Sequence, residues 1–220
     1  QPSAPTSGHW PSSASTDLRR RAIKGLCNRP AFDGGTVTFE EATFNGGIVG
    51  FDDARLSDGT VTFERATFAS GTVDFVRSII QGGTVSFSRA QFEGASVSFL
   101  DTRFAGGTVT FARAVFASGT VAFARARFGG ATVTFEQATF GGDTVAFHRT
   151  TFDDGTVSFT RAAFESGTVP FAEVTFDSGT LSFEQATLDG GRIVFGDSTF
   201  RGTHIDWGPL QRPAGAQPDR

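Results

Sequence analysis

The chain has 220 residues, of which 26 are Phe and 28 are Gly, with no Tyr or Met and a formal net charge of -4 at pH 7. Acidic and basic residues are interleaved and nearly balanced, which argues against the uniform basic surface of a nucleic-acid-binding protein. The single cysteine, Cys27, supports neither an internal disulfide framework nor a cysteine-rich metal site. No stretch is apolar and long enough to span a membrane, and no signal peptide is visible.

Two segments precede the repetitive part of the chain. Residues 1–14 are rich in Pro, Ser and Gly, and this composition predicts a disordered lead-in. Residues 15–30 predict a short helix, with Ser15 or Thr16 as its N-cap and Pro30 at its end. A helix at this position is expected to cap the open end of the first coil of a repeat array.

Residues 31–207 repeat every 12 positions, as in the stretch GTVTFERATFAS. Val61 and Phe63 lie two residues apart, as do Ala66 and Phe68, so each pair points to one side of an extended segment. The spacing of three between Phe63 and Ala66 predicts a bend, and the Gly-rich stretch after Phe68 predicts a wider corner. Short strands joined by regular corners predict an all-β solenoid, in which similar side chains stack about 4.8 Å apart.

Alternate 12-residue units differ systematically, and this difference bears on the length of one coil. Every second unit carries Thr, then Thr or Ser two residues on, and Ala six residues on, whereas the units between them are looser. Direct neighbours in a stack should resemble one another, and a 12-residue coil is too thin for its Phe and Val side chains. We therefore predict a four-sided coil of about 24 residues, with a two-sided coil of 12 residues as the alternative. Seven turns of the four-sided coil would form a rod about 35 Å long.

The stretch VTFERATFAS consists of two five-residue units, each with a small or branched residue two positions before a central Phe, and it resembles the pentapeptide-repeat family. The Arg-, Ala- and Gly-rich composition and the DLRRRAI stretch are similar to an actinobacterial branch of that family. The resemblance implies a right-handed four-sided β-helix. This sequence departs from the family by inserting a Gly-Thr-like dipeptide after every second unit, which would widen two corners. The resemblance concerns the scaffold and carries over no catalytic residue.

The paired Thr and Ser residues form a possible binding wall. In a 24-residue coil they would make two columns on one flat wall, about 4.8 Å apart between coils and about 6.6 Å apart along the strand. The wall comprises Thr36, Thr38, Thr60, Thr62, Thr84, Ser86, Thr108, Thr110, Thr132, Thr134, Thr156, Ser158, Thr180 and Ser182. Such an array resembles the ice-binding face of β-solenoid antifreeze proteins. The structural alternative is that Thr is a favourable outward residue in a strand.

Arginines recur at the predicted bend and form a second candidate surface. They are Arg65, Arg77, Arg89, Arg113, Arg125, Arg149 and Arg161. A stacked column of guanidinium groups could bind an anionic polymer. Acidic residues interrupt this column or directly precede it: Asp53, Asp101, Glu173 and Asp197 interrupt it, and Glu40, Glu64, Glu136 and Glu184 precede it. We therefore predict a solvated edge whose charges compensate one another.

Two weaker patterns remain. Val76, Ile79 and Leu100 stand where polar residues are usual, and they would form a modest apolar docking patch if they point outward. His148 has Glu136 one repeat back, but a single His beside one carboxylate does not make a metal site. No catalytic residues, metal or cofactor are predicted, because no unlike reactive groups converge.

The sequence therefore predicts a non-catalytic repeat scaffold or protein-interaction module. Its partner is expected to be another protein; nucleic acid is not expected, and a membrane would be contacted only through a segment outside this chain. Ice binding through the Thr and Ser wall is the alternative, followed by glycan binding and DNA mimicry. Residues 208–220 form a Pro-rich tail, and Trp207 and Leu210 are expected to cover the second end of the stack.

Overall fold

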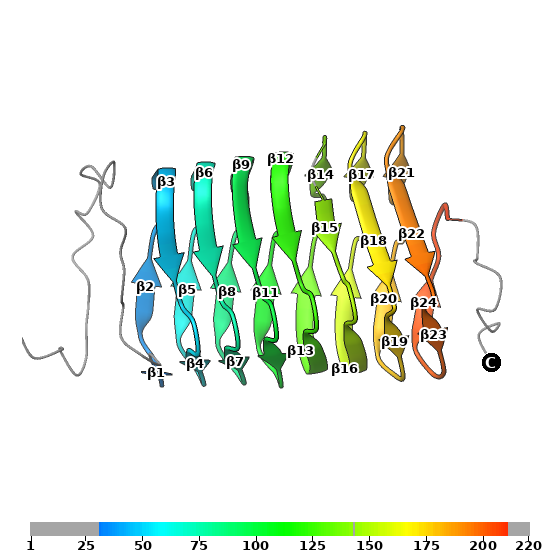
Figure 1. Cartoon of the computed structure of the whole chain (residues 1–220), viewed down its shortest axis with the longest axis horizontal. Coiled ribbons are helices and arrows are strands. Elements are labelled where there is room, and N and C mark those ends of the chain that lie inside the picture. The colour runs from blue at the N-terminus through cyan, green and yellow to red at the C-terminus, as the bar shows by residue number, and fades with distance from the viewer. Residues whose placement is uncertain (1–30, 143, 211–220) are drawn as a thin grey trace, which may run out of the picture.

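The computed structural model describes residues 31–142 and 144–210, which form a single β-solenoid with its coils side by side along one axis (Figure 1). The described residues form strands and turns but no helix. They therefore contain no helix that could cross a membrane. The predicted lead-in of residues 1–14, the predicted capping helix of residues 15–30 and residues 211–220 of the tail lie outside the described residues.

The strand register gives the length of a coil. All strand pairs are parallel, and along the walls they join residues 24 positions apart, as in Thr36 with Thr60 and Phe44 with Phe68. The register shifts by one residue at the glycine corners, as in Asn45 with Ser70. The four-sided coil of 24 residues is therefore confirmed, and the two-sided alternative is wrong. We name the four sides walls D, A, B and C in chain order, so that wall A lies opposite wall C.

Walls A and D share one sheet. Wall A consists of β2 (Thr36–Thr38), β5 (Thr60–Thr62), β8 (Thr84–Ser86), β11 (Thr108–Thr110), the second halves of β13 (Arg127–Thr134) and β16 (Thr151–Ser158), β20 (Thr180–Ser182) and β24 (His204–Asp206). Wall D consists of β1 (Ala31–Phe32), β4 (Arg55–Leu56), β7 (Ile79–Ile80), β10 (Arg103–Phe104), the first halves of β13 and β16, β19 (Thr175–Phe176) and β23 (Thr199–Phe200).

Walls B and C form the second sheet, because several strands continue from one wall to the other. These shared strands are β3 (Thr43–Gly50), β6 (Thr67–Asp74), β9 (Gln91–Ser98) and β12 (Val115–Ala122). Wall B continues with β14 (Thr139–Phe140), β17 (Ala163–Phe164) and β21 (Thr187–Leu188). Wall C continues with β15 (Thr144–Ala146), β18 (Thr168–Ala172) and β22 (Arg192–Gly196).

Each wall contributes one column of large apolar side chains to the core. The rings of Phe63 and Phe87 under wall A stack 4.8 Å apart, and those of Phe75 and Phe99 under wall C stack 5.0 Å apart. Phe rings also form the columns under walls B and D, where Leu56 and Ile80 replace Phe near the start of wall D. The inward-facing phenylalanine ladder predicted from the spacing is confirmed. At the C-terminal end Trp207 packs edge-on against Phe195, 5.4 Å away.

The predicted bend is present after walls A and C in each coil. The second residue of each bend adopts a left-handed backbone conformation, with φ between 52° and 59°, at Glu41, Asp53, Arg65, Arg77, Arg89, Asp101, Arg113, Arg125, Gln137, Arg149, Arg161, Glu173, Gln185 and Asp197. The other two corners use glycine: Gly119 has a φ of 117°, and a Cβ there would lie 2.2 Å from the Ala95 carbonyl oxygen. The backbone therefore passes close to the coil below at these corners.

Candidate binding wall and charged corners

The Thr and Ser residues singled out from the sequence line up on wall A. We call Thr36, Thr60, Thr84, Thr108, Thr132, Thr156 and Thr180 the first column, and Thr38, Thr62, Ser86, Thr110, Thr134, Ser158 and Ser182 the second column. Both columns point away from the core, because the Val or Leu between them is directed inward. His204 and Asp206 of β24 stand at the equivalent positions of the next coil, beyond the two columns.

The second column stabilises the adjacent bend by hydrogen bonds. The Thr110 hydroxyl oxygen accepts a hydrogen bond of 3.2 Å from the backbone N–H of Ala112, two residues on. All seven members of the column accept the same bond, at 3.1 to 3.4 Å. Short polar side chains of this kind stabilise turns by such local bonds. The regularity of the second column therefore has a structural explanation.

The bends that follow wall C are mostly stabilised by other contacts. The equivalent positions are Gly50, Asp74, Ser98, Ala122, Ala146, Pro170 and Val194, and only Ser98 bonds to the bend, through the Leu100 N–H. Elsewhere a hydroxyl from the next coil approaches from inside: Thr150 is buried and donates to the Phe123 carbonyl oxygen at 2.8 Å. The same contact is made by Ser78 to Phe51, by Thr102 to Phe75 and by Ser198 to Phe171.

Among the wall C bends that are followed by another coil, one has neither type of hydroxyl. At the bend that begins with Phe147, the outward-facing residue before the bend is Ala146. The residue of the next coil that could donate from inside is Val174, which is buried. The bend nevertheless adopts the same left-handed conformation, at Arg149. A hydroxyl therefore stabilises these bends without being required for them. The sequence showed that this inward position varies between coils, but it did not reveal the bond to a carbonyl.

The first column has no such structural role. Within the described part of the chain, none of its seven threonines makes a side-chain hydrogen bond to protein. The equivalent positions on wall C are more varied, since Ile48 and Arg192 stand there beside Thr and Ser. The hydroxyl and methyl groups of the first column are therefore available to an external partner.

The arginines at the bends do not form the single interrupted column that the sequence predicts, because successive bends lie on opposite edges of the rod. We call the bend after wall C the C/D corner. There Arg77 pairs with Asp53, Arg125 with Asp101 and Arg149 with Glu173, each across one coil. The hydrogen bond from Arg125 lowers the pKa of Asp101, and that from Arg149 lowers the pKa of Glu173. The predicted charge compensation holds on this edge.

The bend after wall A, which we call the A/B corner, is less evenly compensated. Arg65 contacts the three carboxylates of Glu40, Glu41 and Glu64. By contrast, Arg113 donates its Nε–H to the neutral Gln137 side chain at 2.8 Å. Arg161 makes the same contact with Gln185, and Arg89 lies 4.0 Å from Glu64. Positive charge is therefore left over along the middle of this edge.

The proposed apolar patch is divided between two surfaces. Val76 and Leu100 occupy equivalent places on successive coils of the C/D corner, whereas Ile79 lies on wall D between Arg55 and Arg103. All three side chains are half-buried. The large apolar side chains that are exposed within the described residues, Ile48, Val115 and Val194, are scattered over walls B and C. The structure therefore does not gather a continuous apolar patch from these residues.

The structure also corrects the surroundings of His148. Its Nε2 atom lies 3.9 Å from an oxygen of Glu173, on the next coil, rather than beside Glu136. Glu136 belongs to wall A's bend on the other side of the coil. Among the residues that the structure describes, no group of three His, Cys, Asp or Glu side chains could hold a metal ion.

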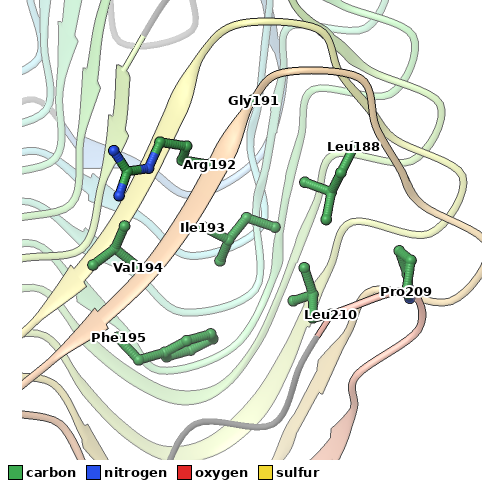
Figure 2. A pocket seen from close by; sticks show the side chains of 8 residues that line it. All are labelled: Leu188, Gly191, Arg192, Ile193, Val194, Phe195, Pro209 and Leu210. Carbon is green, nitrogen blue, oxygen red and sulfur yellow. The ribbon is translucent and has the colours of Figure 1, made fainter.

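A pocket of about 320 Å³ lies at the C-terminal end of the stack (Figure 2). It forms over the last strands of walls B and C, β21 and β22, which have no further coil above them. Its lining residues are Leu188, Gly191, Arg192, Ile193, Val194, Phe195, Pro209 and Leu210. Arg192 is the one charged residue among the described residues of this lining. The described lining is thus mainly apolar, with one charged side chain.

No protein-family model and no curated protein matches the sequence. Solved structures similar to the chain include HetL, a pentapeptide repeat protein involved in heterocyst differentiation regulation from the cyanobacterium Nostoc sp. strain PCC 7120. The identity is 12%, the alignment covers 79% of this chain and 93% of that chain, and the TM-score is 0.18. The four-sided parallel solenoid and its phenylalanine ladder are consistent with the resemblance to pentapeptide-repeat proteins.

Proposed function

We propose that this solenoid is a non-catalytic scaffold that binds another protein through wall A. The observation that carries this proposal is the first column. Its seven threonines repeat in register over seven successive coils, and none of their hydroxyls bonds to another of the described residues. The continuous buried core beneath the wall holds it rigid, so a partner would meet a preformed surface and lose little binding energy to ordering it.

A comparison of two charged variants tests this proposal. Lys at Thr84 and Thr108 would place two ammonium groups on adjacent coils of the first column. Lys at Ser96 and Thr120 would do the same at the equivalent positions of wall C, which makes it the matched control. We expect the unaltered protein and the control to retain the same protein from a lysate of the source cells, and the wall A variant to lose it. Equal retention by all three proteins would contradict a role for wall A.

Ice binding is a second candidate, favoured by the uniform spacing of the first column. The stacked rings beneath the wall fix the distance between coils, at 4.8 Å for Phe87 and Phe111. Regularly spaced hydroxyl and methyl groups on a flat, stiff sheet suit a repeating surface such as ice. The second column would contribute in fixed orientations, because each of its oxygens is held by the bend.

Thermal hysteresis and ice shaping separate this candidate from protein binding. Activity that is lost when Thr108 and Thr132 of the first column are replaced by Leu, and kept when Thr67 and Thr139 on wall B are replaced by Leu, would support ice binding. If the unaltered protein shows neither thermal hysteresis nor ice shaping at high concentration, ice binding is removed as a candidate. That result would leave the protein-binding proposal intact.

A further inference from the structure

Arg89 and Arg113 occupy the same position on successive coils of the A/B corner. The backbone N–H of Arg89 bonds to the carbonyl of Ala112, the residue before Arg113, at 2.9 Å, so the two bends are direct neighbours. Both residues adopt the left-handed conformation, with φ of 59°, and both side chains are exposed. Arg89 and Arg113 are therefore direct neighbours in the column of left-handed residues along the A/B corner.

The surroundings of this pair leave its charge largely uncompensated. The residues before them are Ser88 and Ala112, whereas Glu40, Glu64, Glu136 and Glu184 stand at that place in other coils. The nearest carboxylate to Arg89 belongs to Glu64, at 4.0 Å, and Glu64 is shared with Arg65 at 3.2 Å. Arg113 has a neutral partner, Gln137. Two guanidinium groups therefore retain hydrogen-bond donors for an external anion.

Hydroxyl groups adjoin the pair on the wall A side. Ser86 bonds to Ser88 at 3.2 Å, and Ser88 lies 3.4 Å from the Thr110 hydroxyl. These three side chains connect the two coils that carry Arg89 and Arg113. An anion at the corner would thus meet two cations and a row of neutral hydroxyl groups.

We infer that the Arg89–Arg113 corner binds a short acidic segment of the partner protein, with its carboxylates on the two guanidinium groups and its backbone along the hydroxyls of wall A. This inference rests on the proposed function, because it specifies the chemistry of the partner bound at wall A. Arg pairs carboxylates through charge-assisted, often bidentate hydrogen bonds, which gives such a contact both strength and orientation.

The length of the cationic stretch favours a short acidic peptide over a nucleic acid. On one side along the corner, Arg65 is already paired with three glutamates. On the other side, Glu136 precedes the bend of the next coil. The open stretch therefore spans two coils, or about 10 Å at the usual strand spacing. A long polyanion that followed this edge would meet carboxylates on both sides.

Arg161 provides a matched control within the same column. Like Arg113 it donates its Nε–H to a glutamine at 2.8 Å, but its neighbours on the two adjacent coils are Gln137 and Gln185 rather than another arginine. Gln already occupies this position with φ of 57° and 54°. Replacement of Arg89, Arg113 or Arg161 by Gln is therefore compatible with the bend.

The test is a fluorescence anisotropy titration of the full chain with a labelled oligoglutamate peptide flanked by glycine. We expect binding by the unaltered protein, a loss of about tenfold or more in affinity in the Arg89→Gln, Arg113→Gln double variant, and little change in Arg161→Gln. An equal loss in Arg161→Gln would overturn the inference, as would tighter binding of a DNA duplex of equal charge or no peptide binding at all. If the peptide does not bind while the Thr84→Lys, Thr108→Lys variant still loses the partner protein, the assignment of the corner is wrong and the assignment of wall A remains.

Discussion

Walls A and C are built on the same 12-residue pattern and face each other across the same core, yet their outward surfaces differ. On wall A, Thr or Ser stands at both outward positions of all seven coils that carry the pattern. On wall C the second outward position ranges from Gly50 through Asp74 to Pro170. The interior is shared and the exterior is not, so the repeat itself does not dictate the outward residues.

The hydroxyl groups at the bends explain part of this difference. Wall A stabilises each bend from outside with its second column, as Thr110 does for Ala112. Wall C mostly does so from inside, as Thr150 does for Phe123. Once the second column is assigned to the fold, the first column of wall A remains as the regular feature whose hydroxyls have no hydrogen-bond partner in residues 31–142 and 144–210. This is why we place the binding surface there.

The largest predicted effect is a loss of stability when a core ring is removed, and it tests whether walls A and C share one core. Phe111 under wall A and Phe123 under wall C are both fully buried in mid-stack. Replacement of either by Ala should lower the free energy of unfolding by about 3 to 5 kcal/mol, because each leaves a cavity between stacked rings. Urea denaturation measures both losses, with Thr67→Ala as the outward control. A mild effect in either Phe variant would show that its ring is not part of a shared core.

Two smaller changes in the free energy of unfolding, of opposite sign, are expected at two of the bends after wall C. Thr150→Val removes the inward donor to Phe123 at nearly constant volume, and we expect a loss of about 1 kcal/mol. Val174→Thr adds the same donor beneath the bend at Phe147, which has none, and should raise the free energy of unfolding by up to about 1 kcal/mol. Thermal or urea melts of the two variants report the sign. Changes of the same sign would argue against the carbonyl contact.

The second column of wall A should behave as a set of structural hydroxyls. Thr110→Ala removes the acceptor of the Ala112 N–H, which should cost about 0.5 to 1.5 kcal/mol of unfolding free energy. The measurement is again equilibrium urea denaturation. A loss below experimental error would return the second column to the part of the wall that the fold does not use.

The smallest predicted effect concerns the first column. Thr108→Ala should change the free energy of unfolding by no more than about 0.5 kcal/mol, since the side chain makes no hydrogen bond within the described residues. The same variant should nevertheless weaken retention of the partner protein. A substantial loss of stability without a change in retention would reverse the roles that we assign to the two columns.

The period of the sequence predicted the coil, its inward rings and its bends, because these features depend on spacing within one 12-residue unit. The break between Phe63 and Ala66 located a bend, and the left-handed residue Arg65 lies there. The greater regularity of alternate units favoured 24 residues per coil, since neighbours in a stack must pack against one another.

Contacts between side chains of different coils were less predictable. The arginines at the bends looked like one compensated column, whereas the coil divides them between two edges with different partners. Glu136 was expected near His148, but Glu173 lies beside it because the nearest coil is 24 residues away and not 12. The inward hydroxyl of Thr150 was visible as a departure from Ala, yet its carbonyl partner, 27 residues earlier, required the three-dimensional arrangement.

Cross-linking of introduced cysteines tests most directly whether residues 24 apart, and not 12 apart, are neighbours on wall A. With Cys27 replaced by Ser, cysteines at Thr108 and Thr132 would stand on adjacent strands, about 4.8 Å apart, within the range that a disulfide spans. We predict that mild oxidation joins this pair and leaves cysteines at Thr108 and Thr120 unjoined. Rapid cross-linking of Thr108→Cys with Thr120→Cys, and none with Thr132→Cys, would contradict the four-sided coil and the continuous threonine column built on it.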